Sequence, residues 1–274
     1  MVQPIRTVLT TGANSGIGLA TALHLASLGF HSVGSVRSPE KAADVGTAAS
    51  GAGVAVDTVL LDVTDASRCE EVINELRPWA IVNNAGYSGV GAVEDIGDEE
   101  VWKQVETMLV APMRLARLAL HHMRAVGDGR IVNVSSIYGL TTTPFTGWYQ
   151  ACKHGLEAVS DALRLEVARD GIKVVLIEPG GLKTGIWDQF EQDVARRGGS
   201  RYEHAYRRVR TLLEPFMIFM GEPSHAARAI GRALTARSPR ARYLVGRDAQ
   251  AIAASQPFVP AFLRDRATRI ILGL

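Results

Sequence analysis

The chain has 274 residues, of which 47% are hydrophobic and 21% are charged. This composition excludes a disordered, collagen-like or fibrous protein, and the length allows a large core without metal ions or disulfides. The formal net charge is only +2, so charge gives no reason to expect a nucleic-acid partner. From Glu191 onward, however, 15 arginines stand against seven acidic residues, a local charge of +8 that leaves −6 on residues 1–190.

The two cysteines, Cys69 and Cys152, lie far apart and form no CxxC or Cys/His ligand pattern. This predicts reduced thiols and no metal site. No apolar run reaches the ~18 residues that a membrane span needs, and nothing resembles a signal peptide. We therefore expect a cytoplasmic protein without a transmembrane segment.

Short β-rich segments alternate with helical ones along most of the chain. The predicted strands are 6–11, 31–36, 54–61, 80–83, 130–134, 172–178 and 241–245, and the predicted helices are 16–28, 39–49, 65–76, 98–125, 150–169 and 223–236. Several strands are almost entirely apolar, which is typical of strands buried on both faces. The pattern predicts an α/β protein with one domain over residues 1–274: a doubly wound, seven-stranded parallel sheet with helices on both faces.

Residues 185–221 fit this alternation least. The segment is rich in arginine and contains six aromatic residues: Trp187, Phe190, Tyr202, Tyr206, Phe216 and Phe219. It follows a predicted strand, at the sheet edge where doubly wound folds bind ligands. We expect a helical insertion that covers a substrate site, although packing into the core explains the aromatic residues equally well.

The turn between the first strand and the first helix is rich in glycine: residues 11–18 read Thr-Gly-Ala-Asn-Ser-Gly-Ile-Gly. Gly12 permits a tight turn, Gly16 lets backbone N–H groups approach a pyrophosphate, and Gly18 allows the helix to pack closely. The helix N-terminus adds positive potential, so the turn predicts a dinucleotide site.

The second strand is followed by Arg37 rather than by an acidic residue. An acid there would bind the ribose 2′-hydroxyl of NAD, whereas a guanidinium can pair with the 2′-phosphate of NADP. Arg37 therefore favours NADP (NADPH), with a solvated loop arginine as the alternative. Asp62, after the third strand, is placed to bind an adenine amino group.

A second group of residues carries acid/base chemistry. Tyr149 and Lys153 are four residues apart and hence on one face of a helix, where the ammonium would favour the phenolate. Ser136 ends the fifth strand 13 residues before Tyr149. A serine hydroxyl there could hold a substrate oxygen while Tyr149 exchanges a proton with it.

With these motifs, with Asn-Asn-Ala-Gly at 83–86 and with Pro179-Gly180 and Thr184, the sequence resembles the short-chain dehydrogenase/reductase family, in its shorter branch. The resemblance covers nearly the whole chain and implies a Rossmann fold, with Ser136, Tyr149 and Lys153 as catalytic residues. The cofactor contacts it implies, together with those inferred above, are Gly12, Asn14, Ser15, Gly16, Ile17, Gly18, Arg37, Asp62, Val63, Asn84, Ala85, Gly86, Tyr149, Lys153, Pro179, Gly180 and Thr184.

One position departs from the family pattern. The asparagine that supports a proton relay to the lysine is replaced by Met108, and no asparagine occurs between Ala85 and Val132. A thioether is a poor acceptor and no donor. Gln104, one turn earlier, is a candidate substitute for the amide. The alternatives are a relay through another group or through backbone and water, impaired turnover, or a Met108 that only fills space in a still-functional site.

The resemblance implies an NADP(H)-dependent oxidoreductase that interconverts an alcohol and a ketone or aldehyde. Residues 84–94 and 239–243 resemble the hydroxysteroid/retinol dehydrogenase-like group of this family. The 185–221 segment suits a fairly apolar, steroid-, retinoid- or lipid-like carbonyl substrate. The alternative is a catalytically impaired NADP(H)-binding regulatory or scaffold protein. The family usually forms homodimers or homotetramers, through the helices predicted at 98–125 and 150–169.

Overall fold

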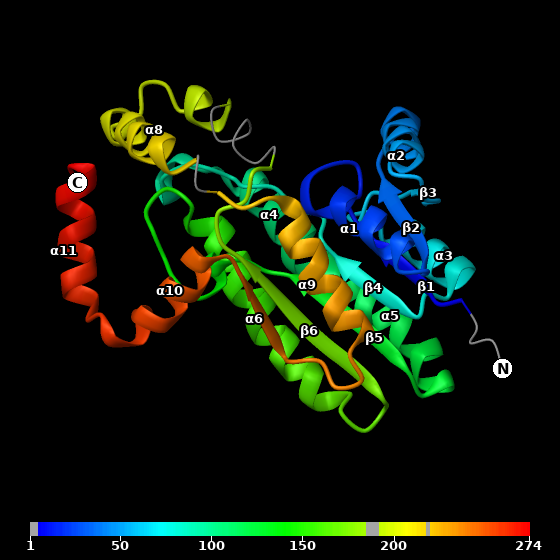
Figure 1. The fold of residues 1–274 in the computed structure, drawn as a ribbon. Coiled ribbons are helices and arrows are strands. Elements are labelled where there is room, and N and C mark those ends of the chain that lie inside the picture. Colours follow the sequence, from blue (N-terminus) through cyan, green and yellow to red (C-terminus); the bar gives the residue numbers. More distant parts are fainter. Residues whose placement is uncertain (1–4, 185–191, 218–219) are drawn as a thin grey trace.

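A computed structural model describes residues 5–184, 192–217 and 220–274 (Figure 1). Its centre is a sheet of seven parallel strands in the order β3-β2-β1-β4-β5-β6-β7. The strands are β1 (Thr7–Thr10), β2 (His31–Val36), β3 (Asp57–Leu60), β4 (Ala80–Asn83), β5 (Gly129–Val134), β6 (Ile172–Pro179) and β7 (Arg242–Val245). This confirms the predicted doubly wound α/β fold.

The strand order reverses between β1 and β4, which are neighbours in the sheet although two other strands separate them in sequence. In doubly wound folds, such a reversal leaves a crevice at the carboxyl ends of the strands. The glycine-rich turn after β1 and the segment after β4 both lie at this point.

Two apolar cores cover the two faces of the sheet. Neighbouring residues of a strand point to opposite faces, so Val8 and Leu9 of β1 enter different cores, and both are fully buried. On one face, α1 (Gly16–Ser27) and α9 (Pro223–Thr235) pack together, with Leu25 and Ile230 in that core. Burial on both faces explains why the sequence shows apolar runs rather than alternation.

The opposite face is covered by α3 (Ala66–Leu76), α5 (Ala111–Val126) and α6 (Gly147–Glu166). Beside β2 and β3 lies α2 (Pro39–Gly51). The predicted strand at 54–61 is three residues too long at its start, because pairing with β2 begins only at Asp57.

The helix predicted at 98–125 is interrupted. It consists of α4 (Asp98–Val105), a π-helical turn at Glu106–Val110, and α5. Pro112 has no N–H to give to the carbonyl oxygen of Met108, four residues earlier, and its ring would crowd that oxygen. The widened turn accommodates the proline and contains Met108.

The C-terminal part contains helices that the sequence did not predict. After α8 (Glu203–Met217) and α9 come β7, α10 (Arg247–Ser255) and α11 (Ala261–Leu272), which lies beside α8 (Figure 1). Within the predicted insertion, 185–191 and 218–219 lie outside the described residues, as do Trp187, Phe190 and Phe219. No helix in the described ranges is long and apolar enough to cross a membrane.

Candidate active site

The glycine-rich turn has the geometry that close approach of a phosphate requires. Gly12 and Gly16 have φ angles of +66° and +53°, a region that favours glycine. A Cβ on Gly18 would lie 2.2 Å from the carbonyl oxygen of Gly12, so any larger residue there would force α1 away from the turn. Gly12 and Gly16 are therefore favoured by their backbone conformation, and Gly18 by the lack of space for a side chain.

The turn is tied to the end of β4. The Thr11 hydroxyl accepts hydrogen bonds from the backbone N–H groups of Asn84 (2.9 Å) and Ala85 (3.0 Å). The Asn84 side-chain amide donates to the carbonyl oxygens of Thr11 (2.9 Å) and Gly12 (3.3 Å). Asn84 and Ala85 thus fix the shape of the turn from the neighbouring strand.

The start of α1 fits a dinucleotide pyrophosphate. The N-cap Ser15 makes no side-chain capping bond, and the first turn holds no acidic residue. The backbone donors and the positive helix end are therefore available to an anion. Thr184 reaches the same place, because its methyl group would lie 3.3 Å from a Cβ on Gly16.

The other predicted cofactor residues lie around this crevice. Asn14 and Ser15 belong to the turn, and Ile17 to the first turn of α1. Val63 follows β3, Pro179 ends β6 and Gly180 comes next, while Gly86 lies against Met108. They gather at the carboxyl ends of four different strands.

Arg37 is exposed directly after β2, and Asp62 lies near enough to feel its charge. Burial acts to raise the pKa of Asp62, but two hydrogen bonds from Thr64 and the charge of Arg37 hold that pKa below its usual value. One oxygen of Asp62 is thus already engaged by Thr64. The adenine contact that the sequence indicates for Asp62 stays a prediction.

Ser136, Tyr149 and Lys153 come together beside β5. Ser136 follows that strand, and its hydroxyl accepts from the N–H of Tyr138 (3.1 Å) and also hydrogen-bonds with the Tyr149 side chain. The Lys153 ammonium lies 5.6 Å from the centre of the Tyr149 ring. It donates to the carbonyl oxygen of Val134 at 2.8 Å.

Burial dominates the electrostatics of this trio. It raises the pKa of Tyr149 to about 12, although the hydrogen bond with Ser136 acts in the opposite direction. It lowers the pKa of Lys153 to about 8, against the attraction of nearby Cys152 and Glu157. The protein alone therefore does not depress the pKa of Tyr149, in contrast to the sequence-based expectation. It holds Tyr149 as a neutral phenol near pH 7 while Lys153 is still mostly charged.

Met108 packs directly into this group. It is buried and shares an apolar cluster with Tyr149 and Cys152. The Gln104 amide is also buried, but both of its polar atoms lack a hydrogen-bond partner among the described residues. It lies against Gly89, where an added Cβ would sit 1.3 Å from the amide nitrogen. In the described part of the chain, Gln104 therefore makes no side-chain hydrogen bond to Lys153.

Two supporting residues were missed at the sequence level. The Gln150 amide donates to the hydroxyls of Thr143 and Thr146 and so ties the loop after Ser136 to α6. Asp248 accepts from the N–H of Gly181 at 2.6 Å and links α10 to the loop after β6. The Asp248 contact joins segments whose proximity no local motif reveals, whereas the Gln150 contacts are local, four and seven residues apart.

Part of the predicted cover lies over the loops that approach the site. Tyr206 of α8 packs against Phe145 at 4.7 Å between ring centres, and its hydroxyl accepts from the N–H of Ala92 at 2.6 Å. Arg197 pairs with both carboxylate oxygens of Glu100, at 2.6 and 2.7 Å. Residues 192–217 are thus anchored to the loop that follows β4 and to the loop before α6.

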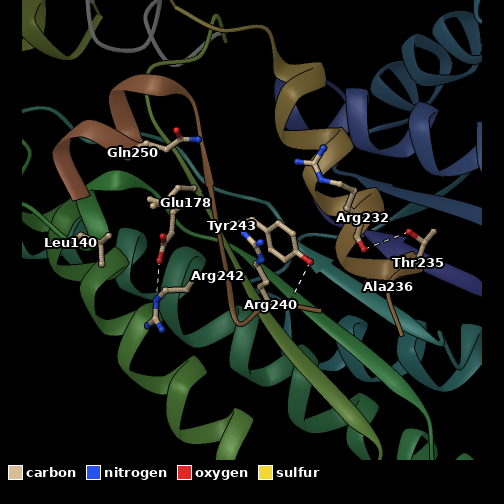
Figure 2. Close-up of a pocket in the computed structure, with 10 residues that line it drawn as sticks. Leu140, Glu178, Arg232, Thr235, Ala236, Arg240, Arg242, Tyr243 and Gln250 are labelled. Carbon is tan, nitrogen blue, oxygen red and sulfur yellow. Dashed lines mark hydrogen bonds and ion pairs between the residues drawn. The ribbon is translucent and has the colours of Figure 1, made fainter. Parts of the chain in front are cut away.

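A separate cavity of about 900 Å³ lies beside β7 (Figure 2). Glu178 points toward Arg242 there, with 3.0 Å between their charged atoms. None of Ser136, Tyr149 and Lys153 lines this cavity. The lining residues are Leu140, Glu178, Arg232, Thr235, Ala236, Arg240, Arg242, Tyr243, Leu244 and Gln250.

Comparisons with known proteins agree with this geometry. The family model described as "short chain dehydrogenase" matches residues 6–195. The chain is 30% identical to 3-ketodihydrosphingosine reductase of Bacteroides thetaiotaomicron, over all of both chains.

Two solved structures share the fold. A short-chain dehydrogenase from Streptomyces avermitilis is 30% identical with a TM-score of 0.79, covering 98% of this chain and 97% of its own. A single-residue variant of actinorhodin polyketide ketoreductase with NADPH is 28% identical with a TM-score of 0.76, covering 89% and 95%.

The matched region begins at the start of β1 and runs past Thr184, so it spans the glycine-rich turn and the Ser136, Tyr149 and Lys153 group. Together with the relative and the neighbours, which are similar along most of their length, it identifies this chain as an oxidoreductase that belongs to the short-chain dehydrogenase family.

Proposed function

We propose that this protein is an NADP(H)-dependent reductase or dehydrogenase that interconverts a ketone or aldehyde with an alcohol on a fairly apolar substrate. The observation that carries the proposal is the hydrogen-bonded pair of Ser136 and Tyr149 with the Lys153 ammonium beside them. The cofactor, when bound, supplies or accepts the hydride.

Each residue of the trio has a role in this proposal. Ser136 orients the substrate oxygen by a hydrogen bond. Tyr149 gives its proton to that oxygen during reduction, which suits a phenol kept neutral by burial. Lys153 holds the ribose of the cofactor and, as a cation, stabilises the phenolate that proton transfer leaves behind.

The preference for NADPH rests on Arg37. Its exposed guanidinium stands at the end of β2, where a 2′-phosphate would lie. The ketoreductase neighbour was solved with NADPH, which supports the same preference. The apolar substrate rests on the aromatic contacts of α8, and the 30% identical relative is named a 3-ketodihydrosphingosine reductase.

Met108 favours one rival function, a cofactor-binding regulatory or scaffold protein with impaired catalysis. It fills the position next to Tyr149 with an apolar side chain, and the buried Gln104 amide makes no hydrogen bond to a catalytic group in the described part of the chain. Ser136, Tyr149 and Lys153 argue for the enzyme, because a protein without turnover has no need of a buried phenol beside a buried ammonium.

The experiment that separates the two is NADPH oxidation by the purified full chain. NADPH and NADH binding are measured first by fluorescence titration. A panel running from small ketones to long-chain and steroidal ketones and aldehydes follows, with product identified by mass spectrometry. We expect tight NADPH binding and turnover that rises with apolar chain length. Binding without turnover on any carbonyl would favour the regulatory protein.

We further propose a single domain over residues 1–274, a cytoplasmic location and a homodimer or homotetramer built through α4, α5 and α6. Exposed apolar side chains on these helices and the turn between them support such contacts, namely Trp102, Val110 and Leu165. Light scattering of the full chain measures the oligomeric state.

A further inference from the structure

The last part of the chain exposes an unusual number of large apolar side chains. Phe258 is 83% exposed, Phe262 and Ile270 are each 68% exposed, and Leu263 is 50% exposed. Single exposed apolar residues are common, but a contiguous group of them marks an interaction site. We call these four residues the C-terminal apolar patch.

Helical spacing places most of the patch on one face of α11. Leu263, Arg266 and Ile270 follow one another at intervals of three and four residues, and Phe262 lies one turn before Arg266. The buried Leu272 and half-buried Thr268, four residues apart, form the other face. The helix therefore turns one stripe inward and a mixed apolar and basic stripe outward.

Helix α11, which carries the outward face, is held against α8 by a buried side chain and a hydrogen bond. Leu272 joins the buried cluster that contains Tyr206 and Ala205 of α8. A hydrogen bond of 3.1 Å links the His204 ring to the carbonyl oxygen of Gly273. Figure 1 shows α11 beside α8 and away from the sheet. The exposure of the patch therefore results from how α11 is seated on α8.

The positive charge of this face favours a lipid surface over a second copy of the chain as its partner. Arg266 and Arg269 are exposed and have no ion-pair partner among the described residues, and the one acid of α11, Asp265, faces Arg264. A symmetric contact with a second copy would gather four arginines, two from each chain, in one small interface, which like charge opposes. Lipid phosphates would pair with them while acyl chains receive the phenylalanine and leucine side chains.

We propose that the outward face of α11, with Phe258 before it, binds the surface of a membrane that contains anionic lipids. The 12 residues of α11 measure about 18 Å, too short for a hydrocarbon core of about 30 Å, so the helix lies in the plane of the interface. Arginine stems can lie along the apolar layer while their guanidinium groups stay at the headgroups. The binding does not depend on the proposed reaction.

Vesicle sedimentation tests the proposal with the full chain and no substrate. The vesicles are phosphatidylcholine alone and a 70:30 mixture of phosphatidylcholine and phosphatidylglycerol. We expect binding to the mixed vesicles, at least tenfold weaker binding to phosphatidylcholine, and weakening at high salt. The double variants F262S/I270S and R266E/R269E should each lower the partition coefficient at least tenfold.

Matched control variants lie away from α11. V126S removes an apolar side chain that is 73% exposed, and R237E reverses an exposed arginine, so both should bind as the wild type does. Melting temperatures and NADPH titration confirm that each variant is folded, and NADPH binding should stay unchanged throughout. The proposal is overturned if the wild type does not sediment with the mixed vesicles, or if F262S/I270S still binds them. A dimer that F262S/I270S converts to monomer, without vesicle binding by the wild type, would instead make this face a contact between copies.

Discussion

The ammonium group of Lys153 donates a 2.8 Å hydrogen bond to the carbonyl oxygen of Val134. Val134 is the last residue of β5, and Ser136 follows two residues later, so this bond fixes α6 against the strand that carries the serine. Tyr149, one turn before Lys153 on the same helix, is thereby set beside Ser136. The segment after β5 and the helix α6 thus present three polar groups to one point.

The first prediction concerns pH. Because burial lowers the pKa of Lys153 to about 8, its charge is lost as pH rises through 8 rather than through 10.5. We expect the turnover of NADPH-dependent reduction to fall above about pH 8, measured as kcat between pH 6 and 10. In Lys153→Arg the guanidinium stays charged, so the alkaline break should move upward even if the maximal rate is lower. A break at the same pH in this variant would assign it to another group.

The second prediction concerns cofactor choice. Arg37→Asp removes the cation after β2 and supplies an acid suited to a ribose 2′-hydroxyl. We expect NADPH affinity to fall roughly 10- to 100-fold, as for loss of a charge-assisted hydrogen bond, and NADH affinity to rise. Fluorescence titration measures both, with Arg237→Asp as a control on another exposed loop. Equal affinities before and after the change would remove Arg37 from this role.

The third prediction concerns Met108. Met108→Asn places an amide beside Tyr149, so kcat should rise roughly threefold or more while the buried amide costs about 1–3 kcal/mol of unfolding free energy. Met108→Leu is the apolar control and should leave kcat unchanged. Steady-state kinetics and urea unfolding measure the two effects.

A companion variant, Gln104→Met, tests the substitute amide. Removing two buried polar atoms without partners should raise the free energy of unfolding by about 1 kcal/mol and leave kcat within threefold. A tenfold fall in kcat in this variant, together with no gain from Met108→Asn, would place the proton relay on Gln104.

The fourth prediction concerns stability. Burial and the neighbouring Glu157 raise the pKa of Glu178 to about 7, although Arg242 opposes this. An unfolded glutamate ionises near 4.5, so between these values the folded chain binds more protons, and its stability falls as pH rises. In Glu178→Gln, the fall in the free energy of unfolding between pH 5 and pH 7.5 should be smaller by roughly 1–3 kcal/mol than in the wild type. Urea unfolding at the two pH values measures it.

The matched control for this experiment is Glu70→Gln, an exposed glutamate on α3. Arg242 also pairs with Asp161 at 2.7 Å, and Asp161 with Arg164 at 3.0 Å, so these charges remain in every variant. If Glu178→Gln keeps the wild-type dependence on pH, the titrating group of this window lies elsewhere.

The sheet could be predicted because its strands are buried on both faces and leave apolar runs such as residues 174–177. The glycine-rich turn and the Tyr149–Lys153 pair could be predicted because their geometry follows from short spacings. The predicted third strand begins three residues before β3. The apolar residues at 54–56 resemble a strand even though no neighbouring strand pairs with them.

What could not be predicted depends on contacts between distant segments. The link from Asp248 to Gly181 joins residues 67 positions apart and appears only when the chain is folded. The π-helical turn depends on Pro112 within a longer helix, where the sequence indicates helix on both sides. Helix α11 was missed because most of its apolar residues face outward rather than toward a core.

The most direct test of the proposed function is the Tyr149→Phe variant, assayed for NADPH binding and for turnover on the best carbonyl of the panel. The change removes one hydroxyl from a buried ring and leaves Lys153 and the glycine-rich turn in place. We predict a loss of kcat of at least about 1,000-fold, with the Kd for NADPH within about threefold of the wild type, because the proton donor is lost while every cofactor contact other than the Tyr149 hydroxyl remains. Turnover equal to that of the wild type would contradict the assignment of Tyr149 as the proton donor and, with it, the proposed mechanism.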